Sequence, residues 1–127
     1  YDAELFACPR EAFLKTWLAL PGHTALGIVE AGALKGYGVL RPCHVGHKIG
    51  PLFADSPEIA ERLFRSLAAK VPGEEVFLDT PQPNVQAMEL ARRHGLTTVF
   101  ETARMYHGPA LATPLERVFG VTTFELG

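Results

Sequence analysis

The chain is poor in cysteine and has little excess of either charge. Cys8 and Cys43 are its only cysteines, and they form neither a C-x-x-C pair nor a disulfide framework, so a reducing, cytoplasmic setting is the default expectation. Twelve Lys and Arg residues face fourteen Asp and Glu residues, which gives a net charge of -2. No apolar run approaches the roughly 20 residues of a membrane span. We therefore expect no nucleic-acid partner and no membrane partner.

Signals for a metal site or a cysteine nucleophile are also weak. His44 and His47 form an H-x-x-H pattern, but residues three apart on a strand point to opposite faces, and no third ligand is evident nearby. Cys43 lacks the His and Asp partners of a catalytic cysteine, so a small buried hydrophobic role is favoured. The sequence predicts no metal.

The chain has 127 residues, of which 47% are apolar, and this fits a single compact domain with a real core. It begins with Tyr1 rather than Met, and we expect it to be part of a longer protein. Periodicity and turn residues predict a helix, three strands, a helix, a strand, a helix and two strands. These elements are expected at residues 8–20, 24–30, 33–42, 45–54, 57–71, 76–80, 84–94, 97–107 and 116–126.

The order of elements predicts an α/β fold. The unit from residue 45 to residue 80 is a strand, a helix and a strand, which implies a right-handed parallel crossover within a mixed sheet that has helices on both faces. Gly50-Pro51 interrupts the strand 45–54 and marks a point where its ladder with the strand 76–80 breaks, leaving a cleft. One apolar stripe is expected in the core: Phe13, Trp17, Ile59, Phe64 and Leu67.

The helix after residue 56 begins in a way that favours bound anions. Ser56 is a suitable N-cap and Pro57 a suitable first residue, and free N–H groups at such a junction attract phosphate. However, Asp55 and Glu58 flank this turn, and residues 49–61 contain no Lys or Arg. The geometry suits a phosphate, whereas the charges oppose one.

A family resemblance explains this combination. The stretch "NVQAMELARRHGL" is similar to the N-x-x-A-x-x-L-Y-x-x-x-G-F segment of the GNAT superfamily of N-acetyltransferases. The stretches "GYGVLRP", "KIGPLFAD" and "FGVTTFELG" resemble the carboxy-terminal domain of bacterial proteins with two GNAT domains in tandem. The resemblance implies the acyl-CoA N-acyltransferase fold with a splayed parallel strand pair, and a chain that is the carboxy-terminal half of a two-domain protein.

The same resemblance implies acetyl-CoA as co-substrate, bound where the strands taken as 46–54 and 75–80 diverge. The residues that match this binding region are Leu52, Phe53, Ala54, Ser56 and Asn84, although Asn84 also suits a simple helix N-cap. The chain departs from the family pattern at two places. "FADSPEIA" lacks the basic residue and the glycines of the [QR]-x-x-G-x-[GA] pyrophosphate loop, and Ala91 stands where a tyrosine often protonates the leaving thiolate. The resemblance therefore indicates an inherited scaffold whose phosphate chemistry is eroded.

Acceptor chemistry has several candidates. Asp79 closes a buried strand at the sheet edge where α/β proteins bind ligands, so it is a candidate base or amine anchor, with a turn cap as the alternative. Tyr106 is the second catalytic candidate. On the predicted strands, Tyr37 and Arg41 share a face, as do Arg104 and Tyr106. These four residues and Asp79 form the expected acceptor site.

Three functions remain open at the level of sequence. The first is an N-acetyltransferase in which this domain shapes the acceptor side or forms a degenerate half-site beside an amino-terminal GNAT domain, acting on a small-molecule or peptide amine. The second is a non-catalytic ligand-binding or dimerisation module, and the third is an independently active transferase with an unusual loop. Eight Phe, three Tyr and one Trp in so short a chain also predict an exposed apolar patch and a possible homodimer.

Overall fold

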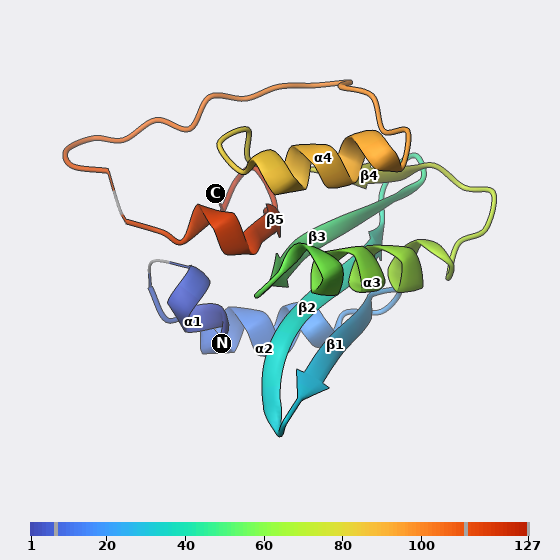
Figure 1. Cartoon of the computed structure of the whole chain (residues 1–127), viewed down its shortest axis with the longest axis horizontal. Coiled ribbons are helices and arrows are strands. Elements are labelled where there is room, and N and C mark those ends of the chain that lie inside the picture. Colours follow the sequence, from blue (N-terminus) through green and yellow to red (C-terminus); the bar gives the residue numbers. More distant parts are fainter. Residues whose placement is uncertain (7, 111, 127) are drawn as a thin grey trace.

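The computed structural model describes residues 1–126 apart from residues 7 and 111 (Figure 1). None of the helices in these residues is long and apolar enough to cross a membrane. The elements follow one another as α1 (Asp2–Leu5), α2 (Glu11–Ala19), β1 (Thr24–Glu30), β2 (Ala33–Pro42), β3 (His47–Ala54), α3 (Pro57–Ala68), β4 (Val76–Leu78), α4 (Val85–Arg93), the 3-10 helix η1 (Leu115–Arg117) and β5 (Val118–Gly120).

The sheet is mixed, as the sequence predicts. β1 and β2 form an antiparallel hairpin that turns at Ala31 and Gly32, both of which have positive φ angles. β2 pairs antiparallel with both ends of β3, with a shift in register between Gly38 and Leu40. β3 pairs parallel with β4 after the crossover through α3. The expected α/β architecture with a parallel strand pair is therefore confirmed.

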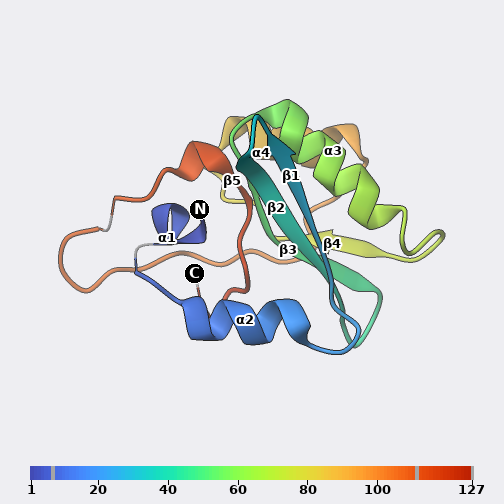
Figure 2. The ribbon, with the colours of Figure 1, turned by 90° about the horizontal axis from the view of Figure 1, so that it is seen from below.

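Helices cover both faces of the sheet (Figure 2). α3 buries Ile59, Leu63, Phe64 and Leu67 against one face, so the expected core positions of α3 are confirmed. α2 lies against the opposite face, but it has no fully buried residue. Phe13 and Trp17 are only half-buried, although Trp17 packs against the buried cluster that contains Tyr37 and Phe53, so neither is a fully buried core residue. The reason is that α2 rests on the sheet with no further layer of protein outside it among the described residues.

The strand pair β3–β4 diverges at the predicted position, but the expected cleft is filled. Parallel pairing ends at Ile49 and Leu78, directly before Gly50-Pro51, whose peptide bond is cis. Because β2 occupies the other edge of β3, the remainder of β3 needs a new partner on the edge that β4 has left. β5 is that partner and runs antiparallel to β3 at Leu52 and Phe53. The ladder break is confirmed, and the prediction of an open cleft is wrong.

The two closing strands are the main errors in the predicted elements. Residues 97–107 form no strand, and each of them is exposed. Of residues 116–126, only Val118–Gly120 are a strand, preceded by the 3-10 helix η1. Alternating β-branched and aromatic residues favoured strands in both places, but a strand also needs a partner for its backbone, and the described chain provides one only for β5.

Asn84 connects α4 to β5. Its side-chain oxygen accepts from the backbone N–H of Ala87 and caps α4, as expected of an N-cap. Its side-chain nitrogen lies 2.9 Å from the carbonyl oxygen of Val118 and 3.0 Å from that of Leu115, and Asn84 is only 4% exposed. One buried amide therefore holds both the helix and the segment that enters the diverging strands.

This double role predicts an unequal effect of two helix-cap substitutions. Asn84→Ala should lower the free energy of unfolding by about 2–4 kcal/mol, because it removes a cap and leaves buried carbonyl groups without a donor. Ser56→Ala removes only the cap of α3, whose bond to the N–H of Ile59 is 3.4 Å long, and should cost about 0.5–1 kcal/mol. Urea unfolding of both variants tests this, and equal losses would show that Asn84 does not anchor β5.

Candidate functional site

The region where β3 and β4 diverge is the site that the sequence predicts for a thioester. Leu52, Phe53 and Ala54 are all buried there, with exposed fractions of 0%, 3% and 0%. Leu52 is paired with Gly120 and Phe53 with Val118, so the free edge of β3 is occupied by the chain itself. The N–H of Val121 also donates to the carbonyl oxygen of Asp79 at 2.9 Å, which ties the end of β5 to the end of β4. In this conformation the residues present do not fit a pantetheine chain.

Two glycines allow β5 to lie this deeply between the strands. A methyl group on Gly120 would come within 2.6 Å of Leu78 Cδ1 and 3.3 Å of Leu52 Cβ. A methyl group on Gly50 would come within 2.7 Å of the carbonyl oxygens of Val121 and Thr122. A side chain at position 50 would meet backbone oxygens, so glycine is required there. At position 120 the nearest atom is the end of the Leu78 side chain, so a larger residue would need Leu78 to move.

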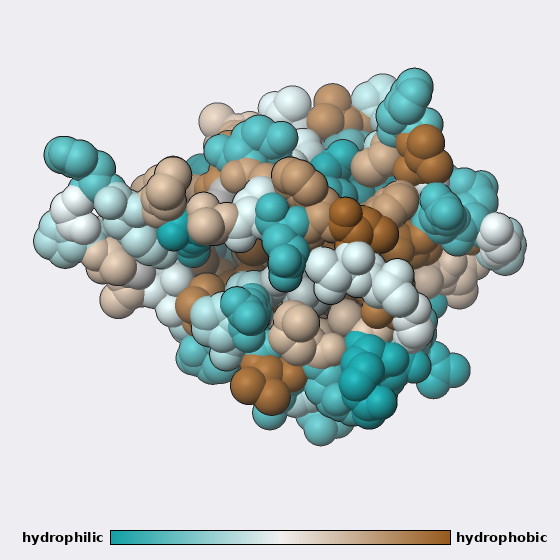
Figure 3. Space-filling view, turned by 90° about the horizontal axis from the view of Figure 1, so that it is seen from above, coloured by the Kyte–Doolittle hydropathy of each residue, from teal (hydrophilic) through white to brown (hydrophobic). Residues whose placement is uncertain are grey.

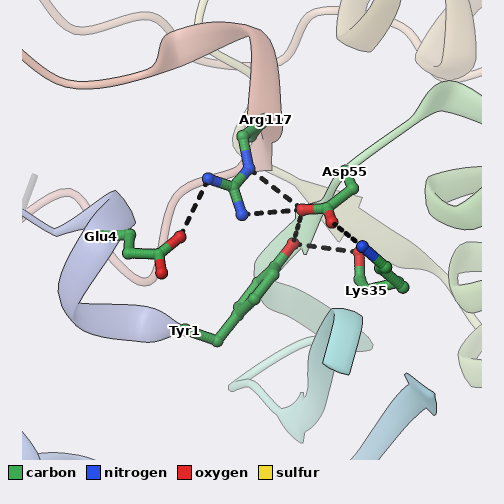
Figure 4. A network of polar contacts seen from close by, with 5 residues as sticks. All are labelled: Tyr1, Glu4, Lys35, Asp55 and Arg117. Atoms are coloured by element: carbon green, nitrogen blue, oxygen red, sulfur yellow. Dashed lines mark hydrogen bonds and ion pairs between the residues drawn. The ribbon is translucent and has the colours of Figure 1, made fainter. Parts of the chain in front are cut away.

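The N-terminus of α3 is also occupied by groups of the chain (Figure 4). Asp55, directly before the N-cap, accepts from Arg117 Nη2 at 2.7 Å and from the Tyr1 hydroxyl at 2.9 Å. Lys35 lies 3.4 Å from the second oxygen of the same carboxylate, and Glu4 lies 3.2 Å from Arg117 Nη1. This Asp55 network joins α1, β2, the N-terminus of α3 and η1.

The network fixes the charge of Asp55. Burial raises the pKa of this carboxyl, but the hydrogen bonds from Tyr1 and Arg117 outweigh it and hold the pKa below its usual range. Burial together with the bond to Asp55 raises the pKa of Tyr1 to about 12. Asp55 is therefore an anion at neutral pH, and the cation Arg117 is already paired with it. A phosphate at this helix end would have to displace a carboxylate that the chain provides.

Asp79, the first catalytic candidate, is engaged in an ion pair. Its Oδ2 lies 2.7 Å from Nζ of Lys48, and the two side chains are only 10% and 19% exposed. Lys48 Nζ in turn lies 5.0 Å from the centre of the Phe124 ring. In this arrangement the Asp79 carboxylate is engaged by Lys48 and is not open to an acceptor amine.

Tyr37 and Arg41 lie on the face of β2 that α2 covers, as the alternation predicts. The Tyr37 hydroxyl donates to Asp2, which also forms an ion pair of 2.8 Å with Arg10. Burial and the neighbouring carboxylate raise the pKa of Tyr37 above its ordinary value, so its proton is firmly held. The Arg41 guanidinium lies 5.5 Å from the centre of the Trp17 ring.

An open hollow of about 330 Å³ lies beside Tyr37, between the first two helices and the β1–β2 hairpin. Its walls are mainly apolar, and Tyr37 and Asp2 provide polar groups. Its lining residues are Tyr1, Asp2, Leu14, Leu18, Ala25, Leu26, Gly27, Leu34 and Tyr37. This hollow therefore contains Tyr37, a predicted acceptor residue.

Arg104 and Tyr106 do not join the other acceptor candidates. Both lie in the exposed segment 97–107, where the Arg104 guanidinium is 5.4 Å from the centre of the Tyr106 ring. The strand predicted for them is wrong, whereas their role in acceptor binding stays a prediction. Within the described residues, no cluster of three or more His, Cys, Asp or Glu side chains is arranged to hold a metal ion.

Sequence reasoning missed the cations that pair with Asp79 and with Asp55. Lys48 could have been found, since it lies on the strand parallel to that of Asp79, close to the point of divergence. Arg117 could not, because it reaches Asp55 across 62 positions of sequence through a segment expected to be a long strand. Asn84 was weighed as a cap, but nothing in the sequence indicated its bonds to η1 and β5.

A mixed sheet with a diverging parallel pair and a capped helix at the divergence defines the class of acyltransferase scaffold that the sequence resemblance implied. The chain belongs to the GNAT acetyltransferase family, because the acetyltransferase (GNAT) domain matches residues 1–120.

Two known proteins are similar to this chain. A holothin acyltransferase from Pseudoalteromonas sp. (strain SANK 73390) is 27% identical over 128 residues, covering 100% of this chain but 44% of its own length. The chain therefore spans less than half the length of that curated relative. An integron cassette protein from the mobile metagenome of V. cholerae has a similar fold, with a TM-score of 0.54 at 16% identity over 80% of this chain and 75% of its own.

Because Asp55 is charged in the folded protein, the stability difference between wild type and Asp55→Asn should depend on pH. Asp55→Asn should lower the free energy of unfolding at pH 7 by about 0.5–1 kcal/mol, because solvent screens this partly exposed pair. The folded-state pKa of Asp55 is depressed, so its contribution is present above the unfolded value of about 3.9 and is lost as the pH falls through the folded value.

The difference between wild type and Asp55→Asn should consequently shrink as the pH falls below about 4. Glu116→Gln, an exposed substitution beside Arg117, is the control and should stay within about 0.5 kcal/mol of wild type. Chemical unfolding from pH 7 down to pH 2.5 measures the difference. A gap that stays constant over this range would mean that the Asp55 charge does not stabilise the fold.

Proposed function

We propose that this chain is the carboxy-terminal domain of a two-domain GNAT protein that transfers an acetyl group from acetyl-CoA to an amine. In this proposal the amino-terminal GNAT domain binds the thioester, and this domain shapes the acceptor side or the interface between the two domains. The acceptor is a small molecule or a peptide amine. The family match and the acyltransferase relative support acyl transfer in general, and the greater length of that relative is consistent with a second domain.

One observation supports this division of roles, in which the amino-terminal domain binds the thioester and this domain does not. The backbone of Leu52 and Phe53 is paired with β5, so the edge that would bind pantetheine is already used. The Asp55–Arg117 pair adds a second obstacle, because it places a fixed carboxylate at the helix end where the pyrophosphate would lie. A domain in this state keeps the scaffold of the family without its own co-substrate site.

The acceptor side is assigned to the face of the sheet that α2 covers. The hollow of about 330 Å³ there has apolar walls with Tyr37 and Asp2 beside them, which suits an amine attached to an apolar group. Tyr37 and Arg41 stay assigned to acceptor binding on this face. Asp79 remains the catalytic candidate only if Lys48 leaves it, and Tyr106 remains one only if the segment 97–107 changes its position.

The occupied strand edge also favours a second candidate, a non-catalytic module that keeps the GNAT scaffold for ligand binding or dimerisation. The two proposals differ in what the amino-terminal part of the protein contains. A preceding domain with an intact [QR]-x-x-G-x-[GA] loop supports the divided acetyltransferase. A full-length protein without such a loop and without acetyl transfer supports the module.

Calorimetric titration of this chain with acetyl-CoA tests the central point. We expect a dissociation constant weaker than about 100 μM, or roughly 5.5 kcal/mol of binding free energy. S-acetylpantetheine, which lacks the nucleotide and its phosphates, is the matched control ligand. It should bind no better, because β5 blocks the strand edge whether or not phosphates are present.

A low-micromolar constant for acetyl-CoA, with chemical-shift changes at the amides of residues 50–54, would contradict this division of roles. Binding of S-acetylpantetheine without binding of acetyl-CoA would show that the Asp55 network, rather than β5, is the obstacle.

A further inference from the structure

Residues 97–107 are unusually apolar for a segment that has no backbone partner. Among the described residues, residues 97–110 make no backbone hydrogen bond to another part of the backbone. Four large side chains in the segment are nevertheless exposed, with Val99 at 74%, Phe100 at 68%, Met105 at 87% and Tyr106 at 42%. Figure 1 shows this segment as the long trace beyond α4, away from the sheet.

The surface around the segment is mixed in character. Figure 3 looks down on the side of the molecule along which the segment runs, and brown hydrophobic residues lie there among teal hydrophilic ones. The segment touches the rest of the chain through Phe100, whose ring centre lies 5.9 Å from that of Phe124. Its sequence, TTVFETARMYH, consists largely of residues that favour strands, and an extended backbone with free N–H and C=O groups is a template for another strand.

The sequence of the segment is complementary to itself. When two antiparallel strands are related by a two-fold axis, each residue faces the residue equally far on the other side of a central position. If Thr102 is the centre, all eleven residues of 97–107 pair. Val99 then faces Met105 of the other copy, and Phe100 faces Arg104.

Other centres are less favourable. A centre at Glu101 or at Arg104 sets that charged residue against its own copy, and like charges directly opposite are destabilising. A centre at Ala103 sets Met105 against Glu101. Of these registers, only the one centred on Thr102 pairs Val99 with Met105 on one face of the ribbon. On the other face it places the Phe100 ring opposite the cation of Arg104.

We propose that residues 97–107 form an antiparallel strand with the same segment of a second copy of this chain, centred on Thr102, and that this ribbon is a dimer interface. Backbone hydrogen bonds supply the attraction, and the Val99–Met105 pairs on one face supply apolar contact. The contact of Phe100 with Phe124 holds the opposite face of the ribbon against each protomer. The proposal does not depend on the acetyltransferase function.

Charge reversal across the two-fold axis tests the register. Val99→Lys with Met105→Lys places like charges opposite each other twice per dimer and should abolish dimerisation. Val99→Glu with Met105→Lys places opposite charges at the same positions and should retain the dimer. The two positions lie six residues apart along one strand, so this rescue can arise only between copies.

The matched control is Val29→Lys with Val85→Lys. These two valines are 63% and 77% exposed in other parts of the chain, and the control adds the same charge as the double lysine variant. Its dimerisation should equal that of wild type. All four proteins are compared by sedimentation equilibrium from about 10 μM to about 1 mM, the range of weak association.

The expected result is a mass that rises toward twice the monomer value for wild type, the control and the Glu/Lys variant, and stays at the monomer value for the Lys/Lys variant. The proposal is overturned by a wild-type monomer throughout the range, by a Lys/Lys variant that dimerises as well as wild type, or by a Glu/Lys variant that dissociates as the Lys/Lys variant does. A wild-type monomer whose amides at residues 98–106 are protected from exchange would show pairing within one chain and would also overturn it.

Discussion

Beyond Pro51, the backbone of β3 has lost β4 as its neighbour and must find hydrogen bonds elsewhere. Buried N–H and C=O groups without partners are costly, so the free edge of a central strand has to be filled by a ligand, by water or by the chain. Here β5 fills it through Leu52 and Phe53. The position of β5, the close approach of residues 121 and 122 to Gly50 and the amide of Asn84 that fixes the start of β5 all follow from this requirement.

The same logic applies to the charge at the end of α3. The N-terminus of a helix attracts negative charge, and in this chain Asp55 and Glu58 supply it. Arg117 then balances Asp55, and because Arg117 directly precedes β5, the charge network and the strand pairing support each other. The edge of β3 that would bind a thioester and the N-terminus of α3 that would bind a phosphate are thus both occupied by one stretch of the chain, from η1 through β5.

The sequence predicted what depends on neighbouring residues and missed what depends on distant ones. The β1–β2 hairpin, the α3 crossover, the cap at Ser56 and the ladder break at Gly50-Pro51 have local signals, and each is present. The strand expected at 97–107 also has a local signal, but nothing within the described chain pairs with it. At the site, Tyr37 and Arg41 lie on one face as alternation requires, whereas the pairing of Asp79 with Lys48 and of Asp55 with Arg117 depends on how the folded segments meet.

The direct test of β5 as the occupant of the strand edge is a nuclear Overhauser measurement in solution. Leu52 and Gly120 are opposite each other in antiparallel strands, so their backbone protons should give strong cross-strand contacts. These contacts should persist unchanged when acetyl-CoA is added in large excess. Their absence from the free protein, or their loss together with the appearance of contacts between acetyl-CoA and Leu52, would show that the edge is open to the co-substrate.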